Sequence, residues 1–548
     1  MPTLRAAAAP KKTAGNTRPY EYSKAVWTWI SIFLAADLVL NIIWMLTIPM
    51  SKAPDEEVRI ILSDYVFQHG ALPNAWDEAV RINGWGFSYA LRPMLVNILG
   101  AFNMWVVSLF TDSLYAQVLA VRIISCFSGT AMVYFVFRCG QYLGWKPAWS
   151  WMAAAICGLM PQITFLAGYH NNDLFSTACV TAVMYCWLRG MREKWTWPDC
   201  IKFAIAMGVT ILSYYNAYPY ILFSIPLFFM TAFHRKMPRH EKREMWKKTG
   251  VIVLITFLIA GWWFIRMGVL YDGDILGSKT RLVMGEQFAE YSKKPSVIFK
   301  PQREGVSYFE LWNFTHGDPF SWSKKTFMSS IALLGVMDFL FPAQVYDYPA
   351  LILTIGLGLF ILQFIYWIVR QIYRAVKKQP CDHQANQDLL FFILAALSAA
   401  LVIALALYYS WTDDYQPQGR YIIPAFTTFV LAMTAGYRFG AIMIGKCFGR
   451  FAQDATTALS WIVSVAAVAF MITLQAYCYG RIMPDYIERP RLTQSYVEHR
   501  LKYSPQGSKQ TAEEAALKKK NPAGSSLSSQ SASENPLPAG QPELVPAQ

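Results

Sequence analysis

The acidic motif APDEEVR, residues 53–59, directly follows the first long apolar stretch of the sequence. Its carboxylates Asp55 and Glu56 are able to act as a general base at a water interface, or to anchor a cation or an amine. An acidic loop after an apolar stretch is also commonly just solvated, so this motif alone is a weak indication. We predict Asp55 and Glu56 as candidate catalytic residues and Arg59 as a candidate substrate-binding residue.

A second polar motif, AGYHNNDLFS, occupies residues 167–176, in a turn of near-minimal length between two apolar stretches. Asp173 is suited to cap the helix that follows. Capping accounts for one of the crowded polar side chains and leaves the others unexplained. We predict Asp173 as a candidate catalytic residue, and His170 and Asn172 as candidate substrate-binding residues.

Two further motifs carry arginines at the edges of apolar stretches. Arg420 of QPQGRYIIPAF stands where one stretch begins, with Tyr415 and Tyr421 beside it. Arg266 of GWWFIRMGVLYDGDILG stands near the end of another. An arginine at a lipid boundary is commonly a snorkelling anchor, but its guanidinium is also the natural bidentate partner of a phosphate. We predict these four residues as candidate substrate-binding residues.

Arg122 lies within an apolar stretch rather than at its edge. A charged side chain inside hydrocarbon costs roughly 2.5–3.5 kcal/mol on insertion scales, so it should face the protein interior or a water-filled cavity and have a partner. Arg122 is therefore either a substrate-binding residue or one half of a structural ion pair, for instance with Asp37.

These motifs need a membrane-embedded scaffold to position them. Of the 548 residues, 55% are apolar and 15% are charged, unlike an ordinary soluble domain. Stretches long enough to cross about 30 Å of hydrocarbon recur along the chain. We predict an all-α membrane protein with about 11 transmembrane helices. The predicted spans are residues 26–48, 114–137, 147–168, 173–188, 201–216, 218–233, 250–268, 349–369, 388–409, 421–437 and 457–479.

Two other apolar stretches, residues 88–111 and 329–345, contain Pro, Asn or Asp and adjoin loops. We predict interfacial or re-entrant helices there, although either stretch could instead span. They fall within two large outer loops, residues 49–113 and 269–348.

Lysines and arginines cluster in the short loops, as in RKMPRHEKREMWKK at residues 235–248, and account for the net charge of +14 without a nucleic-acid partner. If the helices alternate, these clusters all fall on one side, which is predicted to be cytoplasmic. Every motif described above then lies on the opposite, outer face.

The predicted organisation has a cytoplasmic N-terminal segment (1–23), a transmembrane catalytic domain (24–480) and a polar C-terminal segment (481–548). From about residue 502 the chain is rich in Ser, Ala, Pro and Gln. Such a segment cannot bury enough apolar surface to offset its ordering entropy, so we predict disorder. The sequence leaves open on which side of the membrane this tail lies.

In their order along the chain, the motifs resemble those of a bacterial family of multi-pass membrane proteins. That family is similar to the GT-C glycosyltransferases, which include the protein O-mannosyltransferases and the aminoarabinose transferase of lipid A. The resemblance covers about residues 25–440 and also includes SSIALLGVMDFLFPAQVY. It implies a GT-C-like helical bundle with interfacial helices in its outer loops, located in the bacterial cytoplasmic (inner) membrane.

The resemblance further implies transfer of a sugar from a polyprenyl-phosphate donor to a cell-envelope glycan, lipid or protein acceptor on the extracytoplasmic face. Asp55 would be the base that deprotonates the acceptor, with Glu56 as its companion. Asp173 would orient the acceptor or a divalent cation, and metal dependence is left open. Arg266 and Arg420 would hold the donor phosphate.

Other functions fit the same pattern of charges in apolar surroundings. A lipid-linked glycan flippase or another transporter also needs a cavity with buried charged groups. A receptor or scaffold would use the large outer loops but would give Asp55 no chemical role. The concentration of polar motifs on one face favours transfer over alternating access.

Overall fold

The computed structural model describes residues 20–233, 237–317, 319–380 and 382–504. Within these ranges the regular elements are helices, apart from one isolated bridge between Leu334 and Phe339. The predicted all-α class is therefore confirmed for the described residues. The predictions for residues 1–19 and for the tail beyond residue 504 lie outside them.

Eight helices in the described ranges are long and apolar enough to cross a membrane. They are α1 (Lys24–Thr47), α4 (Leu114–Tyr142), α7 (Asn172–Glu193), α10 (Arg239–Leu270), α13 (Gln344–Val376), α14 (His383–Thr412), α15 (Phe426–Lys446) and α16 (Ala452–Glu488). A further candidate is the pair α5 (Pro147–Leu159) and α6 (Pro161–Ala167), which is bent by 59°. Each of these coincides with a predicted span.

The predicted count of about 11 spans is not confirmed. The two remaining predicted spans correspond to α8 (Trp197–Ile211) and α9 (Tyr218–Ala232), which have 15 residues each. At 1.5 Å per residue each extends about 22 Å, less than the hydrocarbon thickness of about 30 Å. Hydropathy alone does not reveal where the intervening turn divides a long apolar run. Because α8 and α9 are consecutive, counting neither as a membrane span leaves the predicted sides of the later loops unchanged.

The stretches predicted as interfacial or re-entrant helices have different outcomes. Residues 88–111 contain α3 (Leu95–Ser108), an apolar helix of 14 residues that is too short to span. Residues 329–345 do not form a helix of their own. They contain the end of α12 (Trp322–Ile331), a loop and the first residues of α13. In that loop Gly335 and Met337 both have positive φ angles, which a helix excludes.

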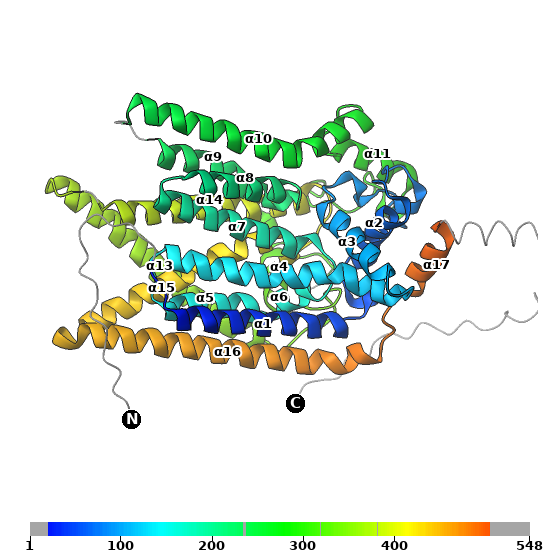
Figure 1. The fold of residues 1–548 in the computed structure, drawn as a ribbon. Coiled ribbons are helices and arrows are strands. Elements are labelled where there is room, and N and C mark those ends of the chain that lie inside the picture. Colours follow the sequence, from blue (N-terminus) through cyan, green and yellow to red (C-terminus); the bar gives the residue numbers. More distant parts are fainter. Residues whose placement is uncertain (1–19, 234–236, 318, 381, 505–548) are drawn as a thin grey trace, which may run out of the picture. The chain divides into compact units, whose positions relative to one another are not determined.

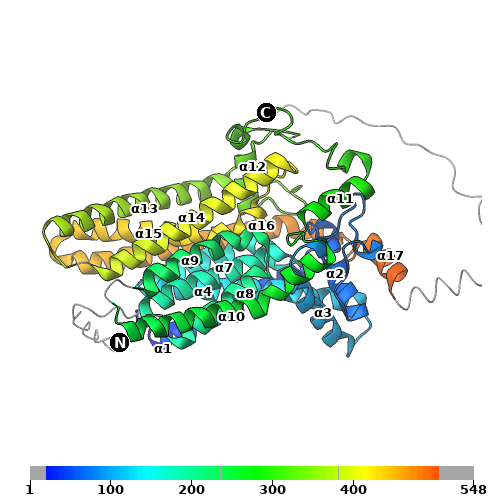
Figure 2. The same cartoon turned by 90° about the horizontal axis from the view of Figure 1, so that it is seen from above.

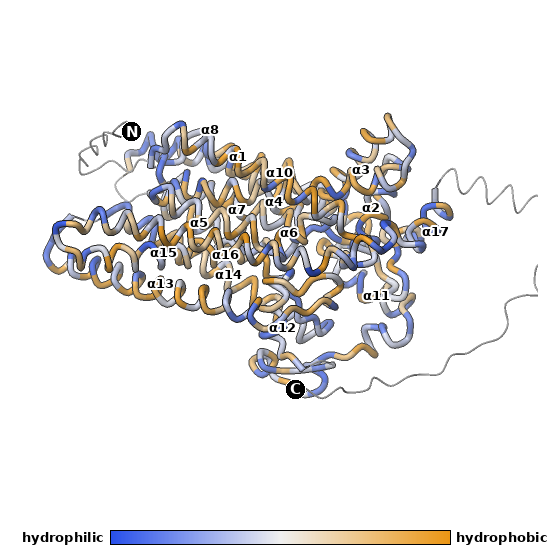
Figure 3. The backbone as a smooth tube through the Cα atoms, turned by 90° about the horizontal axis from the view of Figure 1, so that it is seen from below, coloured by the Kyte–Doolittle hydropathy of each residue, from blue (hydrophilic) through white to orange (hydrophobic). Residues whose placement is uncertain are grey.

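The long helices lie side by side in one bundle (Figures 1 and 2). The most enclosed of them is α7, which packs against α4, α8 and α9. Of the residues in its most apolar 18-residue segment, 83% are buried. In the corresponding segments of α13 and α16, only 11% and 22% of the residues are buried. Figure 3 shows hydrophobic residues along much of the length of the long helices. On α13 and α16 large apolar side chains such as Ile361 and Val465 are exposed, so these two helices are suited to face lipid.

Two outer loops gather at one end of the bundle, where Figures 1 and 2 show α2, α3 and α11 together. Ion pairs join the loops to each other and to the bundle: Lys52 pairs with Asp338, and Arg281 pairs with Asp413. The short elements of this end are η1 (Met50–Lys52), α2 (Glu56–His69), η2 (Glu78–Val80), η3 (Tyr89–Leu91), α11 (Ser278–Phe288), η5 (Tyr291–Lys293), η6 (Glu310–Asn313), η7 (Gly419–Tyr421) and η8 (Ile423–Ala425).

The described residues up to Thr493 form one compact unit, and those from Gln494 onward belong to a second. The described part of the second unit is the helix α17 (Gln494–Tyr503). The candidate site described next lies wholly within the first unit.

Candidate active site

Asp55 is the residue that precedes α2, and it has a left-handed backbone conformation with φ of +58°. This conformation costs most L-residues roughly 1–2 kcal/mol, although Asp and Asn tolerate it better than others. Asp55 stands at the N-cap position, yet its side chain makes no capping hydrogen bond. The carboxylate is therefore not used to begin its own helix, and such local strain is typical of functional sites.

The carboxylate of Asp55 instead faces two arginines. Its Oδ2 lies 2.7 Å from Arg420 Nη2 and 3.8 Å from Arg59 Nη2. Burial would raise the pKa of Asp55, but the charges of Arg420 and Arg59 outweigh it and lower the pKa below its ordinary value. The side chain of Asp55 is 31% exposed, whereas that of Arg420 is 7% exposed. The pair thus combines an accessible carboxylate with a buried guanidinium.

Arg59 connects Asp55 to the second acidic motif. Its Nη1 donates a hydrogen bond of 3.1 Å to Asp173 Oδ2. The side chain of Asp173 is fully buried, and its Oδ1 has no hydrogen-bond partner among the described residues. The structure therefore brings Asp55, Asp173 and Arg420 together from three separate motifs, while their roles stay predictions.

Glu56 and Arg122 form a separate, fully buried ion pair. Arg122 Nε and Nη2 donate to Glu56 Oε1 and Oε2 at 2.8 and 2.6 Å, a bidentate arrangement. Arg122 Nη1 donates to the carbonyls of Met45 and Ile48, and Glu56 also accepts from the backbone N–H of His170. The partner of Arg122 is thus Glu56 and not Asp37. This saturation favours a structural role for both residues over catalysis or substrate binding.

We therefore expect Glu56→Gln or Arg122→Met to destabilise the protein by about 3–5 kcal/mol, because each leaves an uncompensated buried charge. Thermal unfolding of the purified protein in detergent measures this loss. The double variant Glu56→Leu/Arg122→Met should recover part of the stability, since no charge is then left unpaired. A single variant that unfolds like the wild type but loses function would instead support a substrate-binding role.

The turn before α7 differs from the prediction in the residue that caps the helix. Asn171, not Asp173, caps α7, because its Oδ1 accepts the backbone N–H of Leu174 at 2.9 Å. Asn172 Nδ2 donates to the carbonyl of Ser213 at 3.2 Å, which ties the turn to the end of α8. Asp173 is thereby left available for Arg59.

His170 is fully buried beneath this turn, and its Nδ1 has no hydrogen-bond partner among the described residues. Burial, followed by the charges of Arg59 and Arg122, lowers the pKa of His170 to about 3. The imidazole is therefore neutral at physiological pH. It therefore adds no positive charge to the site.

Arg420 is held by its own segment as well as by Asp55. Its Nε donates to Gln418 Oε1 at 2.6 Å, and its Nη2 donates to the Tyr421 hydroxyl at 3.2 Å. The Tyr421 hydroxyl in turn donates to Gln416 Oε1. Nη1 of Arg420 is buried and has no hydrogen-bond partner among the described residues. One donor of this otherwise fixed guanidinium is thus available to a ligand.

Two predicted substrate-binding residues make their contacts elsewhere. Arg266 Nη2 donates to the carbonyl of Pro73 at 2.7 Å, and its guanidinium lies 5.6 Å from the ring centroid of Trp263. Tyr415 packs among the aromatic side chains of the second outer loop, and its hydroxyl donates to the carbonyl of Phe314 at 2.9 Å. Neither makes an ion pair or hydrogen bond with Asp55 or Arg420 in the described contacts.

Four residues near the network were not predicted: Tyr89, Arg92, Tyr169 and Tyr214. The Arg92 guanidinium lies 4.8 Å from the ring centroid of Tyr89, and its Nη1 donates to the Tyr214 hydroxyl at 3.0 Å. The Tyr169 hydroxyl is buried without a hydrogen-bond partner among the described residues. Arg92 carries a sequence signal that could have identified it, because it is a charged residue within an apolar stretch, like Arg122. The tyrosines carry none.

The buried groups without partners indicate what kind of ligand the site would fit. Arg420 Nη1 is a donor, Asp173 Oδ1 is an acceptor, and the Tyr169 hydroxyl can be either. Tyr169 lies close enough to Arg420 and Asp173 to interact with both electrostatically. Because buried polar groups are rarely left without partners, this arrangement suits a molecule that offers both an anionic oxygen and hydroxyl groups.

The donor set does not fit a divalent cation. Asp55 and Asp173 each face a guanidinium within 3.1 Å, and that positive charge opposes a metal ion. In the part of the chain that the structure describes, no group of three or more His, Cys, Asp or Glu residues is arranged to hold a metal. The residues present therefore favour acid–base and ionic chemistry by side chains.

Comparison with known proteins identifies relatives at two levels. A family model described as "Predicted membrane protein (DUF2142)" matches residues 85–428. No curated protein sequence matches the chain.

Solved structures share the fold at low sequence identity. The apo oligosaccharyltransferase of Archaeoglobus fulgidus superposes with a TM-score of 0.50 at 12% identity, covering 90% of this chain and 60% of that enzyme. The archaeal oligosaccharyltransferase AglB from Archaeoglobus fulgidus, in complex with an inhibitory peptide and a dolichol-phosphate, gives a TM-score of 0.48 at 12% identity, with the same coverage. ArnT from Cupriavidus metallidurans bound to undecaprenyl phosphate gives 0.42 at 14% identity, covering 90% of this chain and 80% of ArnT. The similarity to the apo oligosaccharyltransferase shows a GT-C-like fold and no more.

Proposed function

Because the chain belongs to the DUF2142 family of membrane proteins, and its fold is GT-C-like, we propose that it is a membrane glycosyltransferase. It moves a sugar from a polyprenyl-phosphate-linked donor to an acceptor of the cell envelope. The observation that carries this proposal is the contact between Asp55 and Arg420, beside the unpartnered Nη1 of Arg420 and Oδ1 of Asp173. The site therefore offers a base, an anion-binding group and a hydroxyl-binding group at one place.

In the proposed reaction the acceptor hydroxyl attacks the anomeric carbon of the donor sugar, and the new C–O bond forms with inversion. The bond from that carbon to the phosphate oxygen breaks, and its electron pair leaves with the polyprenyl phosphate. Asp55 accepts the proton of the acceptor hydroxyl. Arg420 stabilises the negative charge that develops on the departing phosphate.

The contact between Asp55 and Arg420 adds an ordering of events to this reaction. Among the described residues, the Arg420 guanidinium is the nearest cation to Asp55. A donor phosphate that binds Arg420 competes with Asp55 for the same positive charge. Asp55 then loses part of the charge that lowers its pKa, and it becomes a stronger base only once the donor is bound.

The pH dependence of kcat/KM tests which residue is the base, because this ratio reports the pKa values of the free enzyme. The lowered pKa of Asp55 keeps its carboxylate charged at and above pH of about 4. We therefore expect no loss of kcat/KM as the pH falls from 7 to 5. A decline centred near pH 6.5 would contradict this assignment and would indicate a histidine instead.

The side of the membrane on which the site lies is also part of the proposal. The acidic and arginine motifs lie at the end of the bundle opposite the basic segment that begins α10 (Figure 1). Because Lys and Arg are enriched in cytoplasmic loops, we place the site on the extracytoplasmic face of the bacterial cytoplasmic membrane. Donor and acceptor would both reach it from that side.

A reconstitution assay tests the proposed function against transport. The purified protein in liposomes receives a radiolabelled polyprenyl-phosphate sugar and a cell-envelope acceptor fraction. Covalent movement of label to the acceptor supports the glycosyltransferase. Label that crosses the bilayer while it stays on the polyprenyl phosphate would support a flippase, and the transferase proposal would fail.

A further inference from the structure

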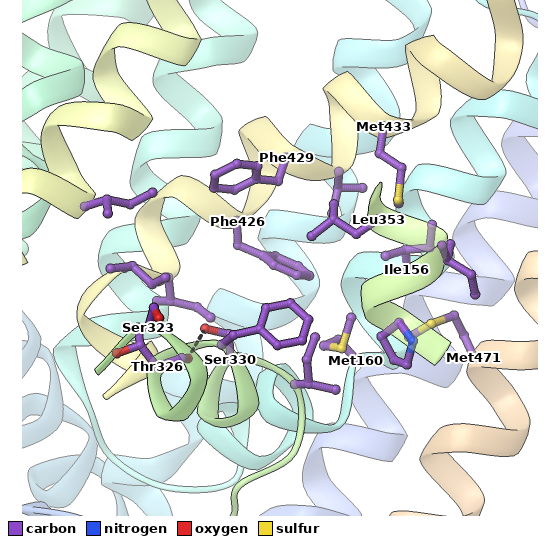
Figure 4. Close-up of a pocket in the computed structure, with 18 of the residues that line it drawn as sticks. Ile156, Met160, Ser323, Thr326, Ser330, Leu353, Phe426, Phe429, Met433 and Met471 are labelled. Atoms are coloured by element: carbon purple, nitrogen blue, oxygen red, sulfur yellow. Dashed lines mark hydrogen bonds between the residues drawn. The ribbon is translucent and has the colours of Figure 1, made fainter. Parts of the chain in front are cut away.

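An apolar cavity of about 250 Å³ lies among α5, α12, α13, α15 and α16 (Figure 4). Large apolar side chains such as Leu353 and Phe429 form its walls. Two of its lining residues, Ile422 and Ile423, follow Arg420 and Tyr421 almost directly in the chain. The cavity is therefore adjacent to the segment that carries the proposed phosphate-binding arginine.

The lining is almost wholly apolar, and its few hydroxyl-bearing side chains lie at one end of the cavity, called the polar end below. Figure 4 shows Ser323, Thr326 and Ser330 of α12 together, with Met433 at the far side. Thr326 is 2% exposed, and its Oγ1 has no hydrogen-bond partner among the described residues. A buried hydroxyl without a partner is costly, so an occupant with a polar atom at this end is favoured.

The polar end is next to η7, the element that contains Arg420. The backbone N–H of Gly419 donates to the Ser329 hydroxyl of α12. A Cβ at Gly419 would lie 2.4 Å from the backbone nitrogen of Ser330, so only glycine permits this approach. An occupant whose polar end lies at α12 would thus have its charged group near Arg420 and its hydrocarbon toward Met433.

The volume of the cavity limits how much hydrocarbon it can hold. An apolar cavity of about 150 Å³ binds benzene, which has six carbon atoms. On the same scale, a cavity of about 250 Å³ holds about ten carbon atoms. Ten carbons correspond to two isoprene units, far fewer than a full polyprenyl chain contains.

We propose that this cavity binds the two isoprene units next to the phosphate, and that the protein recognises this part of the lipid rather than its full length. The inference rests on the proposed function, because it takes the donor to be a prenyl phosphate. The remainder of the chain would lie in the bilayer along α13 and α16, whose apolar surfaces face outward.

Binding to prenyl phosphates of increasing length tests this inference without any sugar transfer. The purified full-length protein in nanodiscs is titrated with unlabelled prenyl phosphates of 5, 10, 15 and 20 carbons, and each competes with a radiolabelled ten-carbon prenyl phosphate. After correction for partition into the bilayer, we expect at least a tenfold gain in affinity from 5 to 10 carbons. Each further isoprene unit should add less than threefold.

A matched pair of variants on α16 tests whether the dependence on chain length arises in the cavity. Ala467 lines the cavity, whereas its neighbour Ala466 is exposed on the outer surface of the same helix. Ala467→Phe should fill part of the cavity, weaken binding of the ten-carbon compound at least tenfold, and leave the five-carbon compound within twofold. Ala466→Phe places the same side chain toward lipid and should change neither.

The outcomes separate this inference from the proposed function. A steady rise in affinity beyond ten carbons, or equal effects of the two variants, would overturn the inference even if sugar transfer occurs. Equal binding by a straight-chain decyl phosphate would also overturn it, because the cavity would then accept acyl-like chains. The expected length profile without any sugar transfer would support the inference and refute the glycosyltransferase.

Discussion

Replacing Asp55 with asparagine is expected to reduce sugar transfer by about 10²–10⁴-fold, the usual contribution of a general base. The substitution keeps the shape of the side chain but removes its ability to accept the acceptor proton. Asparagine also tolerates the left-handed backbone of residue 55 at least as well as aspartate. The fold should therefore persist, and the loss should appear in turnover of the reconstituted enzyme rather than in membrane insertion.

Asp272 provides a matched control for this variant. It is an exposed aspartate of the second outer loop, and its φ of +49° is also left-handed. Asp272→Asn should retain normal turnover, because Asp272 is exposed and no ion pair joins it to the network among the described residues. If Asp55→Asn retained near-normal turnover as well, the assignment of the base would be wrong.

Replacing Arg420 with alanine is expected to lower kcat/KM by about 10²–10³-fold, as for removal of a single oxyanion-stabilising donor. Arg420 offers a free Nη1 to the donor phosphate and supplies the charge that holds the pKa of Asp55 down. Its loss should weaken binding of donor and leaving phosphate alike. Arg420→Lys should recover only part of the activity, because an ammonium cannot form the bidentate contact.

An outer-loop arginine serves as the control for this substitution. Arg303 is exposed, and its guanidinium donates to the backbone carbonyls of Ser296 and Pro295. Arg303→Ala should leave kcat/KM within a factor of about two, as expected for a surface contact. Equal losses in the Arg420 and Arg303 variants would show that Arg420 acts through general stability of the loops and not through the phosphate.

Much of the fold follows from hydropathy alone, and the exceptions have a common cause. The eight long helices coincide with apolar stretches, because each must satisfy its backbone within the hydrocarbon. The unconfirmed spans, α8 and α9, are apolar but short, and the loop after α12 is apolar but contains two residues with positive φ angles. Apolar composition reports burial or lipid contact, but it does not report where the chain turns.

The site was only partly accessible to sequence reasoning. Charges at the ends of apolar stretches indicated Asp55, Asp173 and Arg420, which the structure brings together. Which charges pair was not accessible, because pairing depends on tertiary packing: Glu56 pairs with Arg122, and Arg59 connects the two aspartates. Tyr89, Tyr169 and Tyr214, which also border the site, gave no signal, since tyrosine is common at membrane interfaces for unrelated reasons.

The position of the donor phosphate tests the central claim most directly. A cryo-EM structure of the purified protein with a polyprenyl phosphate would show whether the phosphate binds at the meeting point of Asp55, Asp173 and Arg420. We expect phosphate oxygens within hydrogen-bond distance of Arg420 Nη1, with Asp55 moved away from its 2.7 Å contact. A phosphate bound at Arg266 or at another part of the protein, with the contact between Asp55 and Arg420 intact, would contradict the account.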